Sequence, residues 1–164
     1  DTDRSRGLGD VYKRQIIYRS EIEPGALDIE IPNFILQPLL ENSLMHGLKD
    51  RRYQGTIILK IYRNEQDKNE LNIWLIDDGI GIPDDKMAEL NAYNAKDSEA
   101  LYRVQTRTEG DRTHLGVINV ISRLKLYYQE NAEVIYMRNE TGGTTVKIKI
   151  KTASEETSII AEYF

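Results

Sequence analysis

Hydrophobic residues recur along the chain at the spacings of short helices and strands. After about residue 33, leucines at helical spacing form an apolar stripe that predicts an amphipathic helix. The stripe consists of Leu36, Leu39, Leu40, Leu44 and Leu48. Asn33 is a candidate N-cap and Gly47 is the expected end, although Pro38 lies just beyond the first turn. A second stripe, from about residue 115 to residue 129, predicts another helix.

Five further segments have the composition or the alternation of β-strands. They are residues 27–31, 55–63, 71–77, 133–138 and 144–151. Polar turns join the second segment to the third and the fourth to the fifth, so each of these pairs is expected to be antiparallel. Between residues 84 and 113 charge rises and apolar residues become sparse, which is typical of a lid or functional loop. This order predicts an α/β sandwich, with a mixed, mainly antiparallel sheet and helices on one face.

The sequence indicates one domain between two short flanking segments. Residues 1–15 show no apolar period and are expected to be a scar or a disordered leader, with a native linker as the alternative. Residues 16–151 are the expected domain. Residues 152–164 form a tail without a clear structural assignment.

The composition limits the functions that are open to the chain. With 164 residues and 40% hydrophobic residues, it can bury a core of its own. Acidic residues outnumber basic ones by 27 to 22, and the resulting net charge of −5 disfavours a nucleic-acid partner. The absence of cysteine excludes disulfides and thiolate metal sites. No apolar run approaches the ~20 residues that span a bilayer, so direct membrane insertion is not expected.

The polar side of the first helix carries the first candidate chemistry. Glu41, Asn42, His46 and Lys49 project together, away from the leucines, because residues three and four apart, such as Asn42, His46 and Lys49, share one face of a helix and Glu41 adjoins Asn42. An amide oxygen and a carboxylate suit octahedral magnesium, and a carboxylate beside the ion can polarise an attacking group. A solvated polar face with no such role is the alternative.

A second candidate lies where the strand 71–77 ends. Asp77 is followed by Gly79 and Gly81, in the order Asp-Asp-Gly-Ile-Gly. The glycines allow the backbone to approach a ligand closely, and an ionised carboxylate accepts hydrogen bonds from an exocyclic amine such as that of adenine. Asp and Gly also form ordinary turns, so a strand-terminating turn is the alternative.

Two glycine-containing segments complete the set of candidates. In His114-Leu115-Gly116, the glycine opens a helix whose free N–H groups can bind phosphate oxygens. In Gly142-Gly-Thr144, a hairpin turn also offers a hydroxyl group. Ordinary packing and an ordinary hairpin are the respective alternatives.

In order and spacing, these segments resemble the N, G1, G2 and Gly-Thr boxes of the GHKL ATPase/kinase superfamily. Residues 31–47, IPNFILQPLLENSLMHG, look like the N box of bacterial sensor histidine kinases of the LytS/YesM type. Residues 114–128, HLGVINVISRLKLYY, are similar to their G2 box and the following helix. The resemblance covers roughly residues 16–151. It implies a Bergerat fold, a two-layer α/β sandwich with a flexible ATP lid, and the cofactors ATP and Mg²⁺.

The resemblance also implies roles for the residues of the N box. Asn42 would bind magnesium and Glu41 would be the general base. His46 would lie near the phosphates and Lys49 at the edge of the pocket.

For the remaining boxes, the resemblance implies contacts with the nucleotide. Asp77 would accept a hydrogen bond from adenine N6, above a floor shaped by Gly79 and Gly81, and Thr144 would support this carboxylate, directly or through water. In the G2 box, Gly116 would contact the triphosphate through the lid, beside His114 and Leu115.

Three features depart from the pattern of these kinases. Asp78 stands where many relatives have Asn, and we expect it to point away from the nucleotide. His114 stands where a first glycine is frequent, so the lid is expected to close differently. The two histidines of the chain, His46 and His114, both belong to nucleotide boxes, and the His-Pro-His-Phe acceptor motif is absent.

The sequence is therefore expected to be a cytoplasmic, monomeric catalytic fragment of a kinase whose parent is anchored in the bacterial inner membrane. It would transfer the γ-phosphoryl group to a histidine of a separate dimerisation domain, which then supplies a response regulator. The alternatives are another GHKL enzyme, such as an anti-sigma-factor serine kinase or an ATP-driven clamp, and a GHKL interaction module that binds nucleotide without kinase activity.

Overall fold

Five strands and several helices make up the part of the chain that the computed structural model describes, residues 15–52, 54–107 and 112–152. The strands are β1 (Ile16–Ile22), β2 (Gly55–Arg63), β3 (Glu70–Asp77), β4 (Ala132–Arg138) and β5 (Thr144–Lys151). The α-helices are α2 (Leu36–Asn42), α3 (Asp84–Ala92), α4 (Ser98–Arg107) and α5 (Arg112–Tyr128). None of the helices within these ranges is long and apolar enough to cross a membrane.

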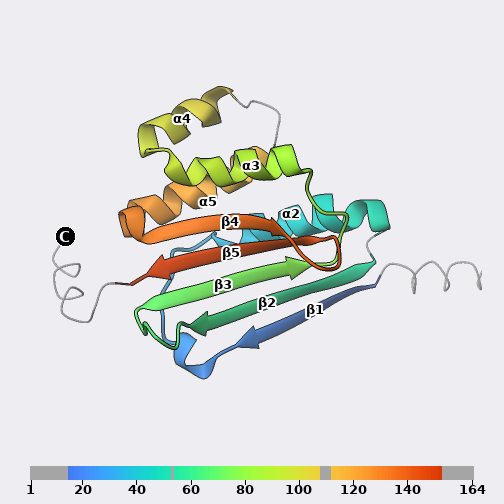
Figure 1. Ribbon diagram of the computed structural model, residues 1–164, viewed down its shortest axis with the longest axis horizontal. Helices are drawn as coiled ribbons and strands as arrows, with labels where there is room; N and C mark the ends of the chain where they lie inside the picture. The colour runs from blue at the N-terminus through green and yellow to red at the C-terminus, as the bar shows by residue number, and fades with distance from the viewer. Residues whose placement is uncertain (1–14, 53, 108–111, 153–164) are drawn as a thin grey trace, which may run out of the picture.

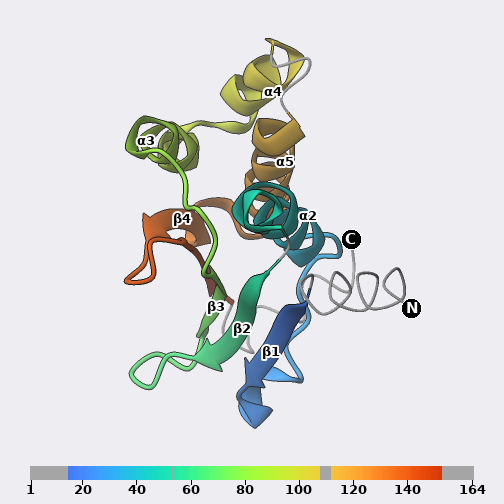
Figure 2. The same ribbon diagram turned by 90° about the vertical axis from the view of Figure 1, so that its right-hand side faces the viewer.

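The strands form one sheet in the order β1-β2-β3-β5-β4. β1 runs parallel to β2, and the other neighbours are antiparallel. The helices lie on one side of this sheet, as the two views show (Figures 1 and 2). This arrangement confirms the predicted fold class, a two-layer α/β sandwich with a mixed, mainly antiparallel sheet.

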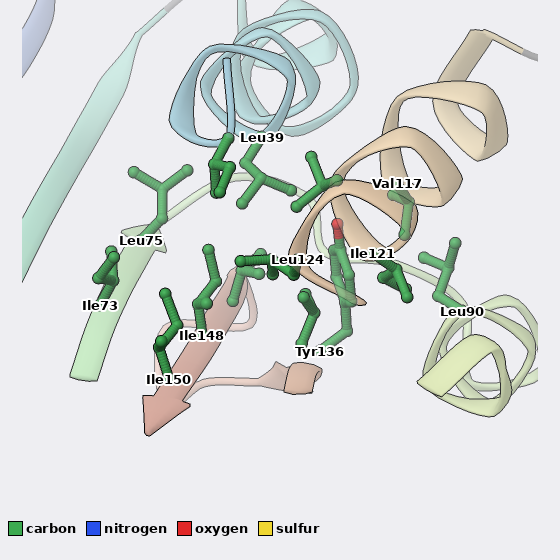
Figure 3. Packing of buried hydrophobic residues seen from close by; sticks show 14 of the residues in the cluster. Leu39, Ile73, Leu75, Leu90, Val117, Ile121, Leu124, Tyr136, Ile148 and Ile150 are labelled. Carbon is green, nitrogen blue, oxygen red and sulfur yellow. The ribbon is translucent and has the colours of Figure 1, made fainter. Parts of the chain in front are cut away.

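The core lies between the sheet and the helices (Figure 3). β3 alternates strictly, so Leu71, Ile73 and Leu75 face the helices and are at most 4% exposed. The opposite face of β3 carries Trp74, whose ring lies 3.9 Å from Nζ of Lys147 on the neighbouring strand. The alternation therefore places the leucines and Ile73 on the helix-covered face and a mixture of polar and apolar side chains on the opposite face.

One predicted strand is wrong, and another was missed. Residues 27–31 are not a strand; they follow the 3₁₀ turn Pro24–Ala26 and pack Ile29 and Ile31 against the core from an irregular segment. The apolar-acidic alternation reflects this one-sided packing rather than a ladder. The strand at this end of the sheet is β1, whose residues after Ile16 are all exposed, so its sequence carries no alternation that would reveal it.

The first helix also ends differently from the prediction. It does not stop at Gly47: a π-helical turn, Ser43–Leu48, and a 3₁₀ turn, Lys49–Arg51, continue the coil. Its N-cap is Ile35, with no side-chain cap, and not Asn33. The chain leaves the coil at Arg52, whose left-handed φ of 56° is the kind of conformation that ends helices.

The region between residues 84 and 113 is largely helical, contrary to the loop that its composition indicated. It contains α3, α4 and the start of α5. Leu90, Tyr93 and Leu101 are its buried anchors, each no more than 3% exposed. These few apolar side chains hold otherwise polar helices, which explains why the periodicity was weak. Flexibility of a lid here stays a prediction.

Two asparagines close the β4 edge of the sheet. The side chain of Asn94 accepts a hydrogen bond from the Val134 N–H at 2.9 Å and donates to the Val134 carbonyl at 2.6 Å. The side chain of Asn91 likewise accepts a hydrogen bond from the Tyr136 N–H at 2.7 Å and donates one to the Tyr136 carbonyl at 2.9 Å. Each amide therefore replaces the partner that a further strand would provide.

We expect Asn94→Ala to destabilise the domain. The substitution leaves two part-buried backbone groups of Val134 unpaired, which costs about 1–3 kcal/mol. Urea unfolding measures the loss, with Asn131→Ala at an exposed position as the matched control. Equal stability of the two variants would contradict the capping role.

Candidate functional site

A buried carboxylate terminates the central strand β3. Asp77 is only 3% exposed and lies on the helix-covered face of the sheet. Its Oδ1 accepts hydrogen bonds from the backbone N–H of Gly79 at 3.0 Å and of Thr144 at 3.2 Å. Its Oδ2 accepts one from the Ser43 hydroxyl at 3.0 Å. Donors from a helix, a loop and a strand therefore meet at one side chain.

Glycines surround this carboxylate because nothing larger fits there. A Cβ at Gly47 would lie 3.2 Å from Oδ1 of Asp77. A Cβ at Gly79 would approach the Gly47 carbonyl oxygen to 2.3 Å, and one at Gly143 would approach the Asp77 carbonyl oxygen to 2.2 Å. These backbones are in contact, so the surroundings of the Asp77 carboxylate are formed mostly by main chain.

Gly81 is held by both its space and its conformation. Its φ is +78°, and a Cβ there would lie 2.4 Å from the carbonyl oxygen of Gly142, in the turn before β5. The segment after Asp77 is thus in close backbone contact with the turn that leads into Thr144. The two glycines in each of these segments permit this close approach.

Ser43 was not singled out by the sequence analysis. It starts the π-helical turn that follows α2 and is 6% exposed. π-helical turns are rare in proteins, and those that occur are often found at functional sites. The turn buries Ser43 and Gly47 against Asp77, and no sequence periodicity announces it. The nearest signal was the interruption of the leucine stripe by small residues.

The side chain of Asn42, the residue that precedes Ser43, faces α5. Its Nδ2 is buried and has no hydrogen-bond partner within the described residues. A Cβ at Gly116 would lie 3.9 Å from this nitrogen and 3.6 Å from Cβ of Pro38. Asn42 and Gly116, far apart in sequence, therefore meet, and Leu115 is half-buried beside them in the chain.

The other polar candidates of this helix lie toward solvent. Glu41, His46 and Lys49 are exposed, and Oε1 of Glu41 accepts a hydrogen bond from Nε2 of Gln37 at 3.1 Å. The structure thus keeps them apart from the leucines, as expected. The side chain of His114 lies outside the part of the structure that is described; its backbone belongs to the first turn of α5.

Asp78 and Thr144 each take part in a hydrogen bond between a backbone N–H group and a carboxylate. Oδ1 of Asp78 accepts the Thr56 N–H at 2.8 Å, at the start of β2, and so the carboxylate points to the sheet. Thr144 donates to Asp77 through its backbone N–H group. The support predicted from its side chain, directly or through water, stays a prediction.

Burial raises the pKa of Asp77 above its ordinary value of 3.8. The N–H groups of Thr144 and Gly79 and the hydroxyl of Ser43 oppose this rise, and the charge of Asp78 adds to it. Because the folded-state pKa is raised, Asp77 contributes stability at low pH that is lost as the pH rises through that pKa. A group held at this cost is a candidate functional residue.

The model of one protein family, the histidine kinase-, DNA gyrase B- and HSP90-like ATPases, matches residues 28–154. The chain belongs to this family. The ATPase domain is 32% identical to the sensor protein LytS of Oceanobacillus iheyensis over 136 residues, which cover 83% of the chain. It is 30% identical to the uncharacterised protein YwpD of Bacillus subtilis over 127 residues, which cover 77% of the chain. We conclude that it is an ATP-binding domain of this ATPase family, similar in sequence to the corresponding region of LytS-type sensor proteins.

Solved structures show the same fold. The catalytic domain of the histidine kinase ThkA superposes with a TM-score of 0.57 at 13% identity, over 91% of this chain and 89% of that one. The blue-light activated histidine kinase of Erythrobacter litoralis superposes with a TM-score of 0.54 at 19% identity, over 95% of this chain and 42% of that one.

The ATPase domain spans only part of its relatives. The matched region is 38% of YwpD and 21% of LytS from O. iheyensis.

We expect Ser43→Ala to shift the pH dependence of ATP binding. Loss of the hydroxyl removes a donor that favours the ionised form of Asp77, so the pKa of Asp77 rises further. If the carboxylate must be ionised to accept from adenine, binding of ATP fails at a higher pH in the variant. Calorimetry from about pH 8 down to about pH 4.5 measures this shift.

Ser122→Ala, at a half-buried position of α5, is the control for this measurement. Superimposable pH profiles for Ser43→Ala and the control would contradict the coupling between Ser43 and Asp77.

Proposed function

We propose that this domain binds Mg-ATP and transfers the γ-phosphoryl group to a histidine on the dimerisation domain of its parent kinase. One observation carries the proposal: a buried carboxylate, Asp77, is held by three donors within a wall of glycine backbone. Burying a carboxylate is costly, so a fold that does so and surrounds it mostly with main chain suits a flat, polar ligand.

Adenine fits the hydrogen-bonding capacity of this carboxylate. Two oxygens offer about four acceptor sites, and the protein's donors use three of them. The exocyclic N6 amine of adenine can donate to the site that is left. Guanine presents a carbonyl oxygen at the equivalent place and would be repelled, so ATP is preferred to GTP. Gly79 and Gly81 form the floor on this proposal.

The C-terminal end of α2 and the N-terminal end of α5 would hold the phosphates. Asn42 is proposed as the protein ligand of magnesium, because its buried amide nitrogen makes no hydrogen bond among the described residues and the group can turn its oxygen outward. Magnesium, when bound, offsets the charge of the phosphates. Gly116, with Leu115 and His114, is proposed to contact the triphosphate. The exposed His46 is proposed to lie near the phosphates and the exposed Lys49 at the edge of the pocket.

Glu41 is proposed as the general base. Its exposed carboxylate can accept the proton of the attacking imidazole while the bond from the γ-phosphorus to the bridging oxygen breaks and ADP leaves. The hydrogen bond from Gln37 fixes the direction of the carboxylate. The acceptor histidine lies on another domain, so the isolated chain is not expected to phosphorylate itself.

The proposed partners follow from this chemistry. The first is the histidine-containing dimerisation domain, and a response regulator receives the phosphoryl group from it. Residues 16–151 are proposed as the functional domain, in the cytoplasm of a cell whose inner membrane anchors the parent.

Asp77→Asn should weaken ATP binding by roughly ten- to 150-fold, because loss of one charged hydrogen-bond partner costs about 1.5–3 kcal/mol. The fold should persist, since an amide oxygen still accepts from Gly79 and Thr144 and the amide nitrogen can donate to the Ser43 oxygen. Titration calorimetry with Mg-ATP measures the change. Asp78→Asn, which keeps the acceptor for the Thr56 N–H, is the adjacent control and should bind normally.

Unchanged affinity in Asp77→Asn would remove Asp77 from the adenine pocket.

Glu41→Gln should retain ATP affinity but lose phosphoryl transfer, by about 10²–10⁴-fold if the residue acts as a general base. Transfer to a separately purified dimerisation domain of a LytS-type kinase, followed with labelled ATP, measures it. Glu130→Gln, at an exposed position after α5, is the control. Full transfer by Glu41→Gln would refute the assignment, whereas ATP binding without transfer by the wild-type chain would favour the non-catalytic interaction module.

A further inference from the structure

The two edges of the sheet are finished differently. The β4 edge is closed by the amides of Asn91 and Asn94, which satisfy the outward backbone groups of Tyr136 and Val134. Within the described ranges, the other edge strand, β1, pairs with β2 alone. An open edge of this kind is a template for another strand.

The backbone groups of β1 that point away from β2 can be identified from its described pairing. The N–H of Glu23 donates to the Ile61 carbonyl on β2 at 2.8 Å. Because the direction of backbone groups alternates along a strand, Glu21 and Arg19 also face β2. The N–H and C=O groups of Tyr18, Ser20 and Ile22 therefore point outward, away from the sheet.

Several large apolar side chains of β1 are exposed to solvent. Ile17 is 45% exposed, Tyr18 is 54% exposed and Ile22 is 39% exposed. Tyr18 and Ile22 lie on the helix-covered face, in register with Ile57 and Ile61, whereas Ile17 lies on the opposite face. Both faces of this edge thus offer apolar surface to an added strand.

We propose that β1 pairs in antiparallel register with β1 of a second copy of this chain, around a two-fold axis at Ser20. In this register, the outward groups of Tyr18 face those of Ile22 of the second copy, and the two Ser20 residues face each other. Arg19 then lies opposite Glu21 of the second copy, on the same face. This is a non-hydrogen-bonded position, where side chains approach most closely.

The charges select this register. Moving the axis by one residue toward the N-terminus places Arg19 opposite Arg19 of the second copy. Moving it by one residue toward the C-terminus places Glu21 opposite Glu21 and brings Pro24, which has no N–H, opposite Tyr18. Like charges directly opposite one another are destabilising, so only the axis at Ser20 combines a ladder with complementary charges.

The surroundings of Glu21 also favour the register with its axis at Ser20. On its own chain it already forms an ion pair with Lys60 of β2, at 3.3 Å. In the pair of strands, its carboxylate would lie between Lys60 and Arg19 of the second copy. The contact is short, because β1 has only seven residues, so the association is weak and reversible. It departs from the monomer that the sequence led us to expect.

Sedimentation velocity of the full 164-residue chain between about 10 µM and 1 mM tests the proposal. We expect a concentration-dependent dimer for the wild type. Arg19→Glu and Glu21→Arg should each weaken self-association by at least about tenfold, because each places like charges opposite one another. An equimolar mixture of the two variants restores complementary pairs and should form the heterodimer.

Ser20→Pro gives an independent variant that spares the fold. It removes an N–H that points outward, and proline is tolerated at such edge positions. It should abolish the dimer without a change in the circular dichroism spectrum. A wild-type chain that stays monomeric to about 1 mM, or a mixture of the charge variants that does not associate, would overturn the proposal.

Discussion

The buried carboxylate of Asp77 constrains much of this domain. A charge that is 3% exposed needs donors, and the three that it has come from segments far apart in the sequence: Ser43, Gly79 and Thr144. Those donors reach it only if the helix, the loop after β3 and the start of β5 converge. The convergence leaves no room for side chains, which is why glycine occupies positions 47, 79 and 143. One polar interaction therefore explains several small residues and a departure from regular helix geometry.

The site divides into a dry part and a wet part. Asp77 lies at the inner end, under backbone, where burial raises its pKa and strengthens any hydrogen bond that it makes. Glu41, His46 and Lys49 lie at the outer end, toward solvent. Asn42 stands between them, next to Gly116 of α5. A nucleotide with a flat base and a charged, hydrated tail has the same division.

The sheet shows a second division, between its edges. At β4, two asparagine side chains complete the ladder and hold the helical region of α3 against the sheet. At β1, the described structure supplies no such cap, and exposed apolar side chains lie beside the charged Arg19 and Glu21. The same physical requirement, that backbone groups find partners, is thus met within the chain at one end and is available to a second molecule at the other.

Local sequence determined the elements whose pattern is one-sided. The strands of residues 55–63 and 144–151, and the helix from about residue 115, were predictable because each buries one face, and the spacing of apolar residues reports that burial. The order and spacing of the carboxylate- and glycine-containing segments also indicated the fold. What the pattern could not report was β1, which is exposed on both faces, or the irregular segment 27–31, whose isoleucines only imitate a strand.

The candidate site was predictable in its residue types and not in its contacts. Glu41, Asn42, Asp77 and the glycines stand out by chemistry and spacing. The sequence could not show that Ser43 donates to Asp77, or that Thr144 does so through its backbone, because both depend on a π-helical turn and on strand register. Periodicity records which side of an element is buried, whereas hydrogen bonds between distant segments exist only once tertiary structure has brought them together.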